Sequence, residues 1–515
     1  MSLPTAADSS VRASERWTWA VAVTALFAAV VIVAGAYHEP WRDEVVPLSI
    51  ARRARSLAEL AAPLRFEGHP ILWYLVLWGG WELVGRTWIL KAASLGSAIG
   101  AVFLLNRSAL PRWLACLVTF SFFPLYQYSV ICRGYGLEML LLFACCALVP
   151  RRHAHPLALG LTLAAFANTE AFGLIMAVAL AAMLVVDAWP RRVLDRWGGV
   201  ALAVFVAGLV LAILVAFPDA GHRGVEVRQL DGSQITHALT RAILDPAAHA
   251  TRIAVLPLPS LWVWAYFVYL ARKPALLCFA ALALVGMETF VILVPHLGAV
   301  WHKGNVVLAI VATMWLDAAG GLTALALPVA VERARTWLGR VLLAGVATMF
   351  AVHVWWAADH LLLDFRADYS MNRRFGELLR SDPTLATAVV MGEPEAPLWS
   401  IPYYADQRIF LAREDTFRDW GVVAPPRRAD YDLGSLLEAA RRVRGECACP
   451  VVIAMGWDLQ TVGGHVNFAG TKFEETFLIT AEQRDAFLAA TRRIAVHTPT
   501  ITDEWYDVFV LQDSR

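Results

Sequence analysis

The stretch TWAVAVTALFAAVVIVAGAYHEPWRDE (residues 18–44) decides the architecture, because an uncharged apolar run ends there in a charged segment. The run from Thr18 to Tyr37 has the roughly 20 residues that a helix needs to cross the hydrocarbon core of a bilayer. The segment Trp41-Arg42-Asp43-Glu44 follows at the membrane surface. We therefore predict that Asp43 and Glu44 face an aqueous compartment beside lipid, where a carboxylate can act as a general base.

The composition points to a membrane protein throughout. Hydrophobic residues make up 58% of the 515 residues, charged residues only 17%, and there are 21 tryptophans. This is more apolar surface than an ordinary soluble fold of this length buries. The net charge of +1 gives no support for nucleic acid as a partner. The first apolar run lacks a small-residue cleavage site and precedes further runs, so we interpret it as a retained helix.

Cysteine usage predicts no disulfide framework. Most of the seven cysteines fall in apolar runs, whereas Cys447 and Cys449 lie near the C-terminus with one residue between them. That spacing would strain a disulfide bond.

Basic residues alternate with the apolar runs and give the topology. The connections that we expect in the cytoplasm, where Arg and Lys are in excess, contain Arg12 and Arg16, Arg107 and Arg112, Arg151 and Arg152, Arg191, Arg192 and Arg196, Arg272 and Lys273, and Arg333, Arg335 and Arg340. The outer connections are those around 133, 168–170, 218–252 and 296–304. The pattern predicts about eleven spans, at 18–37, 88–106, 112–130, 134–149, 156–169, 171–188, 198–217, 254–271, 275–295, 305–327 and 338–358. Because the number of spans is odd and the basic connections are cytoplasmic, the N-terminus lies in the cytoplasm and the residues after 360 lie outside.

Two segments of the outer first loop, residues 38–87, need separate treatment. The apolar segment 70–84 is short, and a full crossing there would invert every later loop. We therefore expect a re-entrant element backed by protein. Residues 45–62 mix apolar side chains with Arg52, Arg53 and Glu59, a pattern typical of an amphipathic helix that lies in the interface.

Residues 361–515 have the composition of a soluble domain, in contrast to the transmembrane module 1–360. The patterns predict helices at 371–379, 433–444 and 481–493 and strands at 387–391, 408–411, 451–455 and 505–511. We expect a small extracytoplasmic α/β domain. It contains no Walker A loop or Rossmann glycine fingerprint, so nucleotide use has no support.

Glu67 and His69 stand where the chain re-enters the membrane, next to Pro70, which fixes the start of a helix. They could orient a phosphate or a metal ion. Alternatively, they cap that helix and hydrogen-bond neighbouring backbone. For Asp43 we favour a functional role, because an acidic pair at the lipid boundary is costly without one.

Further polar residues are expected at the same face. Tyr128 precedes Arg133, whose guanidinium suits bidentate phosphate binding; the alternative for Arg133 is snorkelling at the interface. Glu170 lies in an outer turn between two spans. His302 and Lys303 could neutralise a lipid-linked phosphate, and a plain interfacial belt would look similar.

Taken together, these features resemble the integral-membrane glycosyltransferases of the GT-C fold, in particular bacterial enzymes similar to the protein O-mannosyltransferases and the lipid A aminoarabinose transferase. The resemblance covers residues 18–358. It rests on the Asp-Glu pair after the first span, the interfacial helix, the outer C-terminal domain, the segment His69-Pro70-Ile71-Leu72-Trp73-Tyr74, and the helix end with Tyr126, Tyr128 and Arg133.

The resemblance implies a polyprenyl-phosphate sugar as donor and Asp43 as the base on the acceptor, with Glu44 or Glu67 orienting it. Many relatives have a lysine before the re-entry proline, where this chain has Gly68-His69. Phosphate binding would then fall to His69, Arg133, His302 or Lys303.

The sequence thus favours a glycosyltransferase of the plasma (inner) membrane that transfers a hexosyl or pentosyl group to a glycan, lipid or protein acceptor at the outer face. The rival is a secondary transporter for a lipid-linked or small polar substrate, with Glu138, Glu288 and Arg133 lining its path. A third hypothesis is a noncatalytic assembly or lipid-binding protein. No cofactor is required by the sequence. A divalent cation is compatible with the acidic and histidine residues, but no spacing among them is diagnostic.

Overall fold

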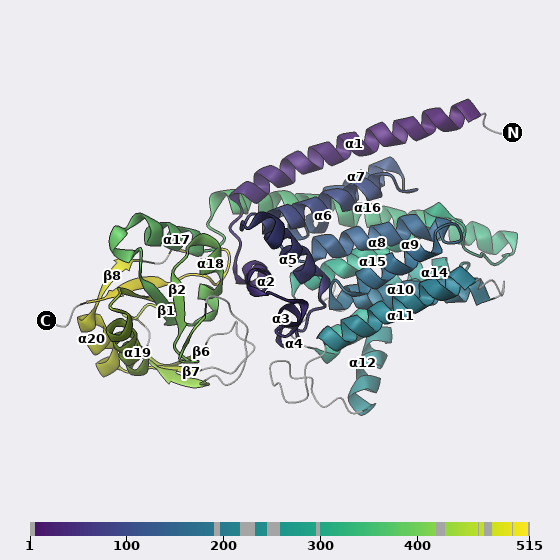
Figure 1. The fold of residues 1–515 in the computed structure, drawn as a ribbon. Helices are drawn as coiled ribbons and strands as arrows, with labels where there is room; N and C mark the ends of the chain where they lie inside the picture. Colours follow the sequence, from purple (N-terminus) through teal and green to yellow (C-terminus); the bar gives the residue numbers. More distant parts are fainter. Residues whose placement is uncertain are drawn as a thin grey trace.

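A computed structural model describes residues 6–189, 196–216, 232–244, 258–294, 299–418, 428–461, 463–467, 476–496 and 498–512. Figure 1 shows a bundle of long helices joined to a smaller α/β region, with the N-terminus at the far end of the bundle and the C-terminus at the far end of the α/β region. The helical part comprises α1 (Ala6–Tyr37), α2 (Arg42–Arg53), α3 (Leu57–Ala61), α4 (Leu64–Glu67), α5 (Leu72–Val84), α6 (Ile89–Asn106), α7 (Arg112–Thr119), the π-helical turn η1 (Phe123–Gln127), α8 (Tyr135–Leu148), the 3-10 turn η2 (Val149–Arg151), α9 (Pro156–Ala167), α10 (Ala171–Ala188), α11 (Arg196–Ala216), α12 (Gly232–Leu244), α13 (Leu258–Leu270), α14 (Pro274–Leu293), α15 (Val300–Ala319) and α16 (Val329–Arg366).

Among the described helices, six are long and apolar enough to cross a membrane: Glu15–Tyr37, Ile89–Asn106, Ala171–Ala188, Arg196–Ala216, Pro274–Leu293 and Val329–Arg366. They coincide with spans expected from the sequence. Other expected spans correspond to the helices α8, α9, α13 and α15. Parts of the expected connections, including Arg191, Arg192 and most of 218–252 and 296–298, lie outside the described residues.

Two expected spans are shorter in the structure. The segment 112–130 is broken after α7, and Pro124 stands near the start of the π-helical turn that follows, where the missing N–H of proline interrupts regular helical bonding. The segment 305–327 ends early because α15 stops before Gly320 and Gly321, whose φ angles are 70° and 81°. Glycine adopts this left-handed backbone at little cost.

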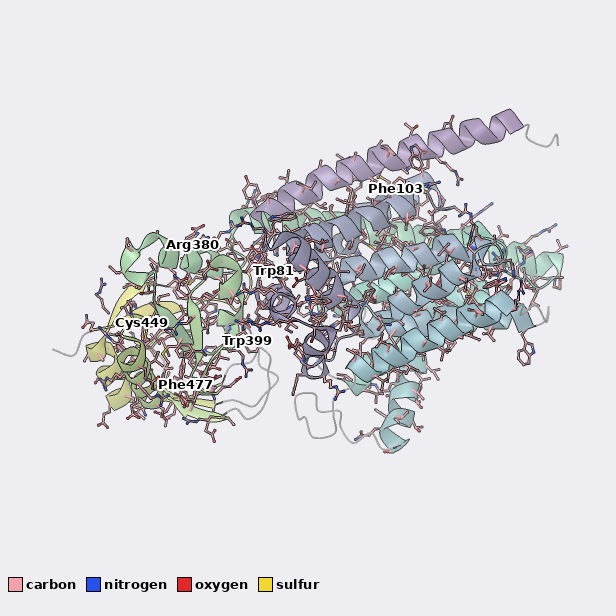
Figure 2. All side chains as sticks on the ribbon, in the orientation of Figure 1. Trp81, Phe103, Arg380, Trp399, Cys449 and Phe477 are labelled. Carbon is pink, nitrogen blue, oxygen red and sulfur yellow. A yellow bond between two sulfur atoms is a disulfide. The ribbon has the colours of Figure 1, made fainter. Side chains whose placement is uncertain are left out.

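The structure does not contain the single interfacial helix that we expected over residues 45–62. The chain forms two helices, because Ala54 is extended and the side chain of Ser56 caps the start of α3. Moreover, α2 is largely buried, and Val45, Leu48 and Ile50 belong to a core that also receives Trp399 and Tyr403 from the α/β region. Figure 2 labels Trp399 at this junction. α2 therefore lies between protein surfaces.

The boundary expected at residue 360 falls inside α16, which continues to Arg366. The α/β region follows with α17 (Asn372–Ser381), η5 (Pro383–Leu385), β1 (Val389–Glu393), η6 (Ala396–Ser400), α18 (Ile401–Tyr404), β2 (Arg408–Leu411), β3 (Thr416–Phe417), β4 (Asp430–Asp432), α19 (Leu433–Cys447), β5 (Val451–Met455), β6 (Gly464–Asn467), β7 (Thr476–Ile479), α20 (Ala481–Ala490), β8 (Thr491–Ala495) and β9 (Asp507–Leu511).

The described residues of this region form two sheets, a larger one in the order β3-β2-β1-β5-β9-β8 and a smaller one in the order β4-β7-β6. β1 is parallel to β2 and β5, whereas β9 is antiparallel to β5. Alternate residues of a strand point to opposite faces, so Val389 and Val451 pack with α19, while Val390 and Val452 pack with Phe375 of α17. The helix expected to reach residue 493 ends at Ala490, because residues 491–495 pair with β9.

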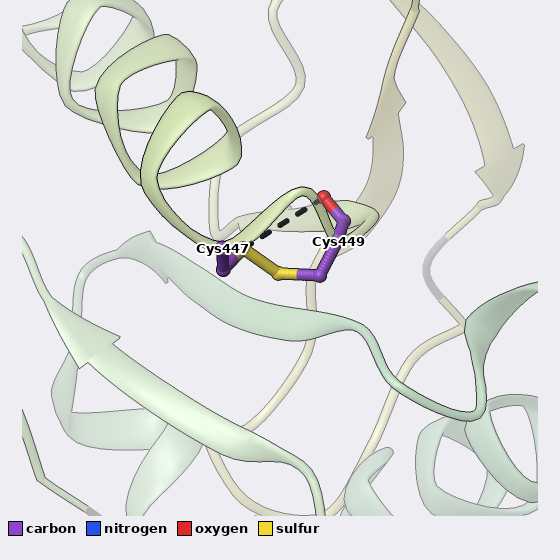
Figure 3. Close-up of a disulfide and its surroundings, with 2 residues drawn as sticks. All are labelled: Cys447 and Cys449. Atoms are coloured by element: carbon purple, nitrogen blue, oxygen red, sulfur yellow. Dashed lines mark hydrogen bonds between the residues drawn. A yellow bond between two sulfur atoms is a disulfide. The ribbon is translucent and has the colours of Figure 1, made fainter.

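The expectation of no disulfide is wrong, because Cys447 and Cys449 are joined (Figure 3). Cys447 ends α19, and Ala448 adopts a left-handed φ of 49° that turns the chain back. This turn brings the two Cα atoms within 5.1 Å, inside the range that a disulfide bridges.

Candidate functional site

Asp43 and Arg133 form the centre of the site. Asp43 lies in the first turn of α2, and Arg133 lies in the turn that precedes α8. Arg133 Nη1 donates a hydrogen bond to Asp43 Oδ2 over 3.3 Å. The side chain of Asp43 is 33% exposed and that of Arg133 only 12%. An accessible carboxylate therefore sits beside a cation that is mostly shielded from water.

Two aromatic rings fix the guanidinium of Arg133. Its central carbon lies 5.4 Å from the ring centre of Tyr135 and 5.2 Å from that of Trp301. Cation–π contacts of this kind orient a guanidinium and weaken its need for water. Arg133 is thus anchored inside the protein, in contrast to the snorkelling alternative.

Glu44 is adjacent to Asp43 in sequence but fully buried. It accepts hydrogen bonds from the backbone N–H groups of Trp41 and Cys132, and it contacts His38 Nε2 at 3.0 Å. These contacts join the first loop to the chain before Arg133. Glu44 is thus engaged by His38 and by two backbone N–H groups, whereas Asp43 next to it is partly exposed.

His38 bridges two carboxylates and was not singled out by the sequence. Its Nδ1 lies 3.0 Å from Asp364 Oδ2 near the end of α16, and its Nε2 faces Glu44. Burial lowers the pKa of His38, but the carboxylates of Glu44 and Asp364 outweigh this effect and raise the pKa to about 9. At neutral pH an imidazolium therefore ties α1, α2 and α16 together. Its position directly after the first span was the available signal.

Lys91 was also missed, although a lysine inside a predicted span is a notable feature. Its ammonium donates to the carbonyl oxygens of Gly35 and His38, over 2.7 and 2.8 Å. Gly35 lies in the last turn of α1 and His38 follows the helix directly, so the cation also complements the helix dipole. Lys91 fixes the exit of the first loop from α1.

His69, Glu67 and Glu170 meet at the edge of the site. His69 Nδ1 donates to the backbone carbonyl of Glu67 over 2.8 Å, and its Nε2 lies 3.5 Å from Glu170 Oε2. The backbone contact expected as the alternative for His69 is present, and so is a carboxylate partner. Burial raises the pKa of Glu170 to about 7, against the opposing charge of Arg133.

The start of α15 supplies the remaining candidates. The hydroxyl of Tyr128 donates to the carbonyl of Trp301 over 2.6 Å, and Trp301 Nε1 donates to His302 Nε2 over 3.1 Å. His302 stacks on Phe172, and half-buried Lys303 follows in the same helical turn. The ring of Trp301 also contacts the guanidinium of Arg133. Trp301 thus connects these residues to Asp43.

A glycine permits this approach of α15. A Cβ atom added at Gly304 would overlap the Tyr128 hydroxyl and the ring of Phe123. Any other residue at this position would push α15 away from the turn that holds Tyr128 and Arg133.

The α/β region holds the first loop from the opposite side. The guanidinium of Arg42 donates to both carboxylate oxygens of Asp503, over 2.5 and 2.8 Å, and its backbone N–H donates to Glu504 over 2.8 Å. Tyr404 donates to the carbonyl of Pro40 over 2.7 Å. Asp43 is thus positioned by residues from both ends of the chain.

Glu504 is the centre of this junction and is fully buried. Besides the N–H of Arg42, it accepts hydrogen bonds from Ser370, Asn372 and Ser400. Burial raises the pKa of Glu504 to about 7, against the opposing effects of Arg42 and the hydroxyl and amide donors. The sequence offered no local signal for this role.

Two residues of the transporter hypothesis, Glu138 and Arg133, lie in one neighbourhood, because both interact electrostatically with Tyr135. Glu138 is fully buried in α8, and its carboxylate has no hydrogen-bond partner among the described residues. Glu288 is buried in α14. Arg133 donates to Asp43. Among the described residues, no group of three or more His, Cys, Asp or Glu side chains is arranged to hold a metal ion.

No protein-family model and no curated protein sequence matches the chain. The structure is similar to the crystal structure of ArnT from Cupriavidus metallidurans in the apo state, with a TM-score of 0.49 and 14% sequence identity. The match covers 96% of this chain and 98% of that chain.

Proposed function

We propose that this protein is an integral-membrane glycosyltransferase that moves a sugar from a polyprenyl-phosphate donor to an acceptor hydroxyl at the outer face. The observation that carries the proposal is the contact between the accessible carboxylate of Asp43 and the anchored guanidinium of Arg133. Transfer from a lipid phosphate needs a base and a cation side by side, in a site poor in water near the lipid headgroups.

In the proposed reaction Asp43 accepts the proton of the acceptor hydroxyl. The hydroxyl oxygen forms a bond to the anomeric carbon of the sugar while the bond from that carbon to the phosphate oxygen breaks. Arg133 then faces the polyprenyl phosphate that departs, and charge-assisted hydrogen bonds stabilise its developing negative charge. Lys303 at the start of α15 adds positive charge to the same end of the bundle, and His302 lies beside it as a polar partner.

In this scheme His69 and Glu170 bind the sugar and take no part in the proton transfer. A carboxylic acid with a pKa of about 7 is partly protonated at neutral pH, so Glu170 can donate or accept a hydrogen bond. We assign this pair to the hydroxyl groups of the sugar, with Glu67 holding the ring of His69 through its backbone carbonyl. The base and the cations are all side chains, and the scheme requires no cofactor.

The proposed setting is the plasma (inner) membrane, with the N-terminus in the cytoplasm and the α/β region outside. The basic turns between the spans support this orientation. The donor would carry a hexose or a pentose, and the acceptor would be a glycan, a lipid or a protein.

The test compares Asp43→Asn with Glu59→Gln, an exposed carboxylate of the same loop. Both variants are reconstituted in nanodiscs with polyprenyl-phosphate hexose and pentose donors and a cell-envelope fraction as acceptor. We expect Asp43→Asn to lower the release of polyprenyl phosphate at least about a hundredfold, the scale of a lost general base. Glu59→Gln should retain activity. Turnover like that of the wild type in a folded Asn variant would remove Asp43 from the mechanism.

A further inference from the structure

A second site lies at the opposite end of α16. An open cavity of about 460 Å³ is lined by Leu327, Val329, Glu332, Arg333, Thr336, Trp337 and Arg340. α16 has 38 residues, and Asp364 near its other end bonds to His38. At 1.5 Å per residue, Arg333 lies about 47 Å from Asp364 along the axis. Figure 1 shows α16 running along the bundle away from the α/β region. This cavity is therefore separate from the site around Asp43.

Two positive charges in the cavity have no partner within the described part of the chain. Arg333, Thr336, Trp337 and Arg340 share one face of α16, since they follow the i, i+3, i+4 and i+7 spacing. Neither Arg333 nor Arg340 makes an ion pair, hydrogen bond or ring contact with another described residue. Two uncompensated guanidinium groups on one face attract an anion.

The acidic residue in the lining is already neutralised. Glu332 binds Arg272 over 2.7 Å and Arg335 over 2.9 Å. Arg335 also lies over the ring of Tyr269 from α13, at 4.7 Å. Glu332 therefore does not compensate Arg333 or Arg340, and its contacts hold the start of α16 against α13 and the turn that follows it.

The surroundings identify a lipid as the occupant. Trp337 is 66% exposed and Val329 is 69% exposed, and both line the cavity together with the arginines. An exposed tryptophan beside arginines at the end of an apolar helix is typical of the headgroup layer of a bilayer. A small soluble anion would leave these apolar surfaces uncovered, whereas a phospholipid covers them with its first methylene groups.

We propose that this cavity binds the headgroup of an anionic phospholipid, with its phosphate between Arg333 and Arg340 and its acyl chains along Trp337 and Val329. Basic residues at the end of a transmembrane helix attract anionic headgroups through such charge complementarity. The bound lipid holds the start of α16 in one leaflet. It thereby sets how deeply α16, which contains Asp364 near its other end, lies in the membrane. This inference does not depend on the proposed glycosyl transfer.

The test measures lipid binding to the purified full chain in detergent by native mass spectrometry and thermal stabilisation. The probes are phosphatidylglycerol, zwitterionic phosphatidylcholine and inorganic phosphate alone. In the double variant Arg333→Gln/Arg340→Gln, we expect the affinity for phosphatidylglycerol to fall roughly 10- to 30-fold, because each arginine near an anionic headgroup contributes about fivefold and the variant removes two. Binding of phosphatidylcholine should not change.

The matched control is Arg16→Gln/Arg151→Gln, which removes two basic residues that donate to backbone carbonyls. An equal loss of affinity for phosphatidylglycerol in this control would show that the effect comes from general surface charge. That result would overturn the proposal. Binding of inorganic phosphate as tight as that of phosphatidylglycerol would overturn the lipid as occupant. Arg333→Lys/Arg340→Lys keeps the charge, so an intermediate affinity in a normally folded variant is the expected result for a guanidinium site.

Discussion

Neutralising Glu504 should change how the stability of the protein depends on pH. Glu504 is fully buried at the junction between the first loop and the α/β region, and its pKa is raised to about 7. Glu504→Gln keeps the size of the side chain and mimics the protonated acid at every pH. The variant therefore isolates the contribution of one titrating group.

The sign and size follow from the raised pKa. A carboxyl group whose folded pKa exceeds its ordinary value, 4.5, stabilises the folded state at low pH, and this contribution is lost as the pH rises through 7. Above pH 7 the folded protein must hold a charge in a buried position. Between pH 5 and pH 8 the wild type should lose about 2–3 kcal/mol through this group, since each tenfold change in a proton-binding constant corresponds to about 1.4 kcal/mol.

The assay is thermal unfolding of the full chain in detergent at a series of pH values from 5 to 8. The melting temperature of the wild type minus that of Glu504→Gln should fall across this range by roughly 2–3 °C, because the unfolding entropy of a 515-residue chain is about 1.1 kcal/mol per kelvin. Glu438→Gln, which removes an exposed carboxylate on α19, serves as the control and should track the wild type. A difference between wild type and Glu504→Gln that stays constant with pH would refute the reasoning.

Three further predictions concern the site and the topology. Arg133→Glu should strongly weaken the binding of polyprenyl phosphate, because it places an anion beside an anion in a poorly screened site, while the affinity for a water-soluble sugar changes little; equal affinities for polyprenyl phosphate in both proteins would return Arg133 to a snorkelling role. Gly304→Ala should destabilise the protein by about 1–3 kcal/mol, seen as a lower melting temperature, because its Cβ would overlap the Tyr128 hydroxyl; an unchanged melting temperature would show that α15 shifts freely. Reporter fusions after residue 366 should be active only outside the cytoplasm, and activity confined to the cytoplasm would contradict the orientation.

Features that depend on local sequence patterns could be predicted before the fold was known. The length and apolarity of residues 18–37 were enough to predict a spanning helix, and the apolar runs of β1 and β5 were enough to predict strands. Asp43 could be singled out because a carboxylate directly after a span is visible in one dimension. These features follow from the period and length of hydrophobic runs. Both are properties of neighbouring residues and do not depend on residues far away in the chain.

The tertiary structure decided which of these residues act together. Asp43 and Glu44 are indistinguishable in sequence, yet one is accessible and the other is buried against His38. Arg133 pairs with Asp43 across 90 positions, and Glu504 receives the N–H of Arg42 across 462. Burial and pairing at such separations arise only when helices and sheet pack, because the free energy of a buried charge depends on every group around it and not on its neighbours in the chain.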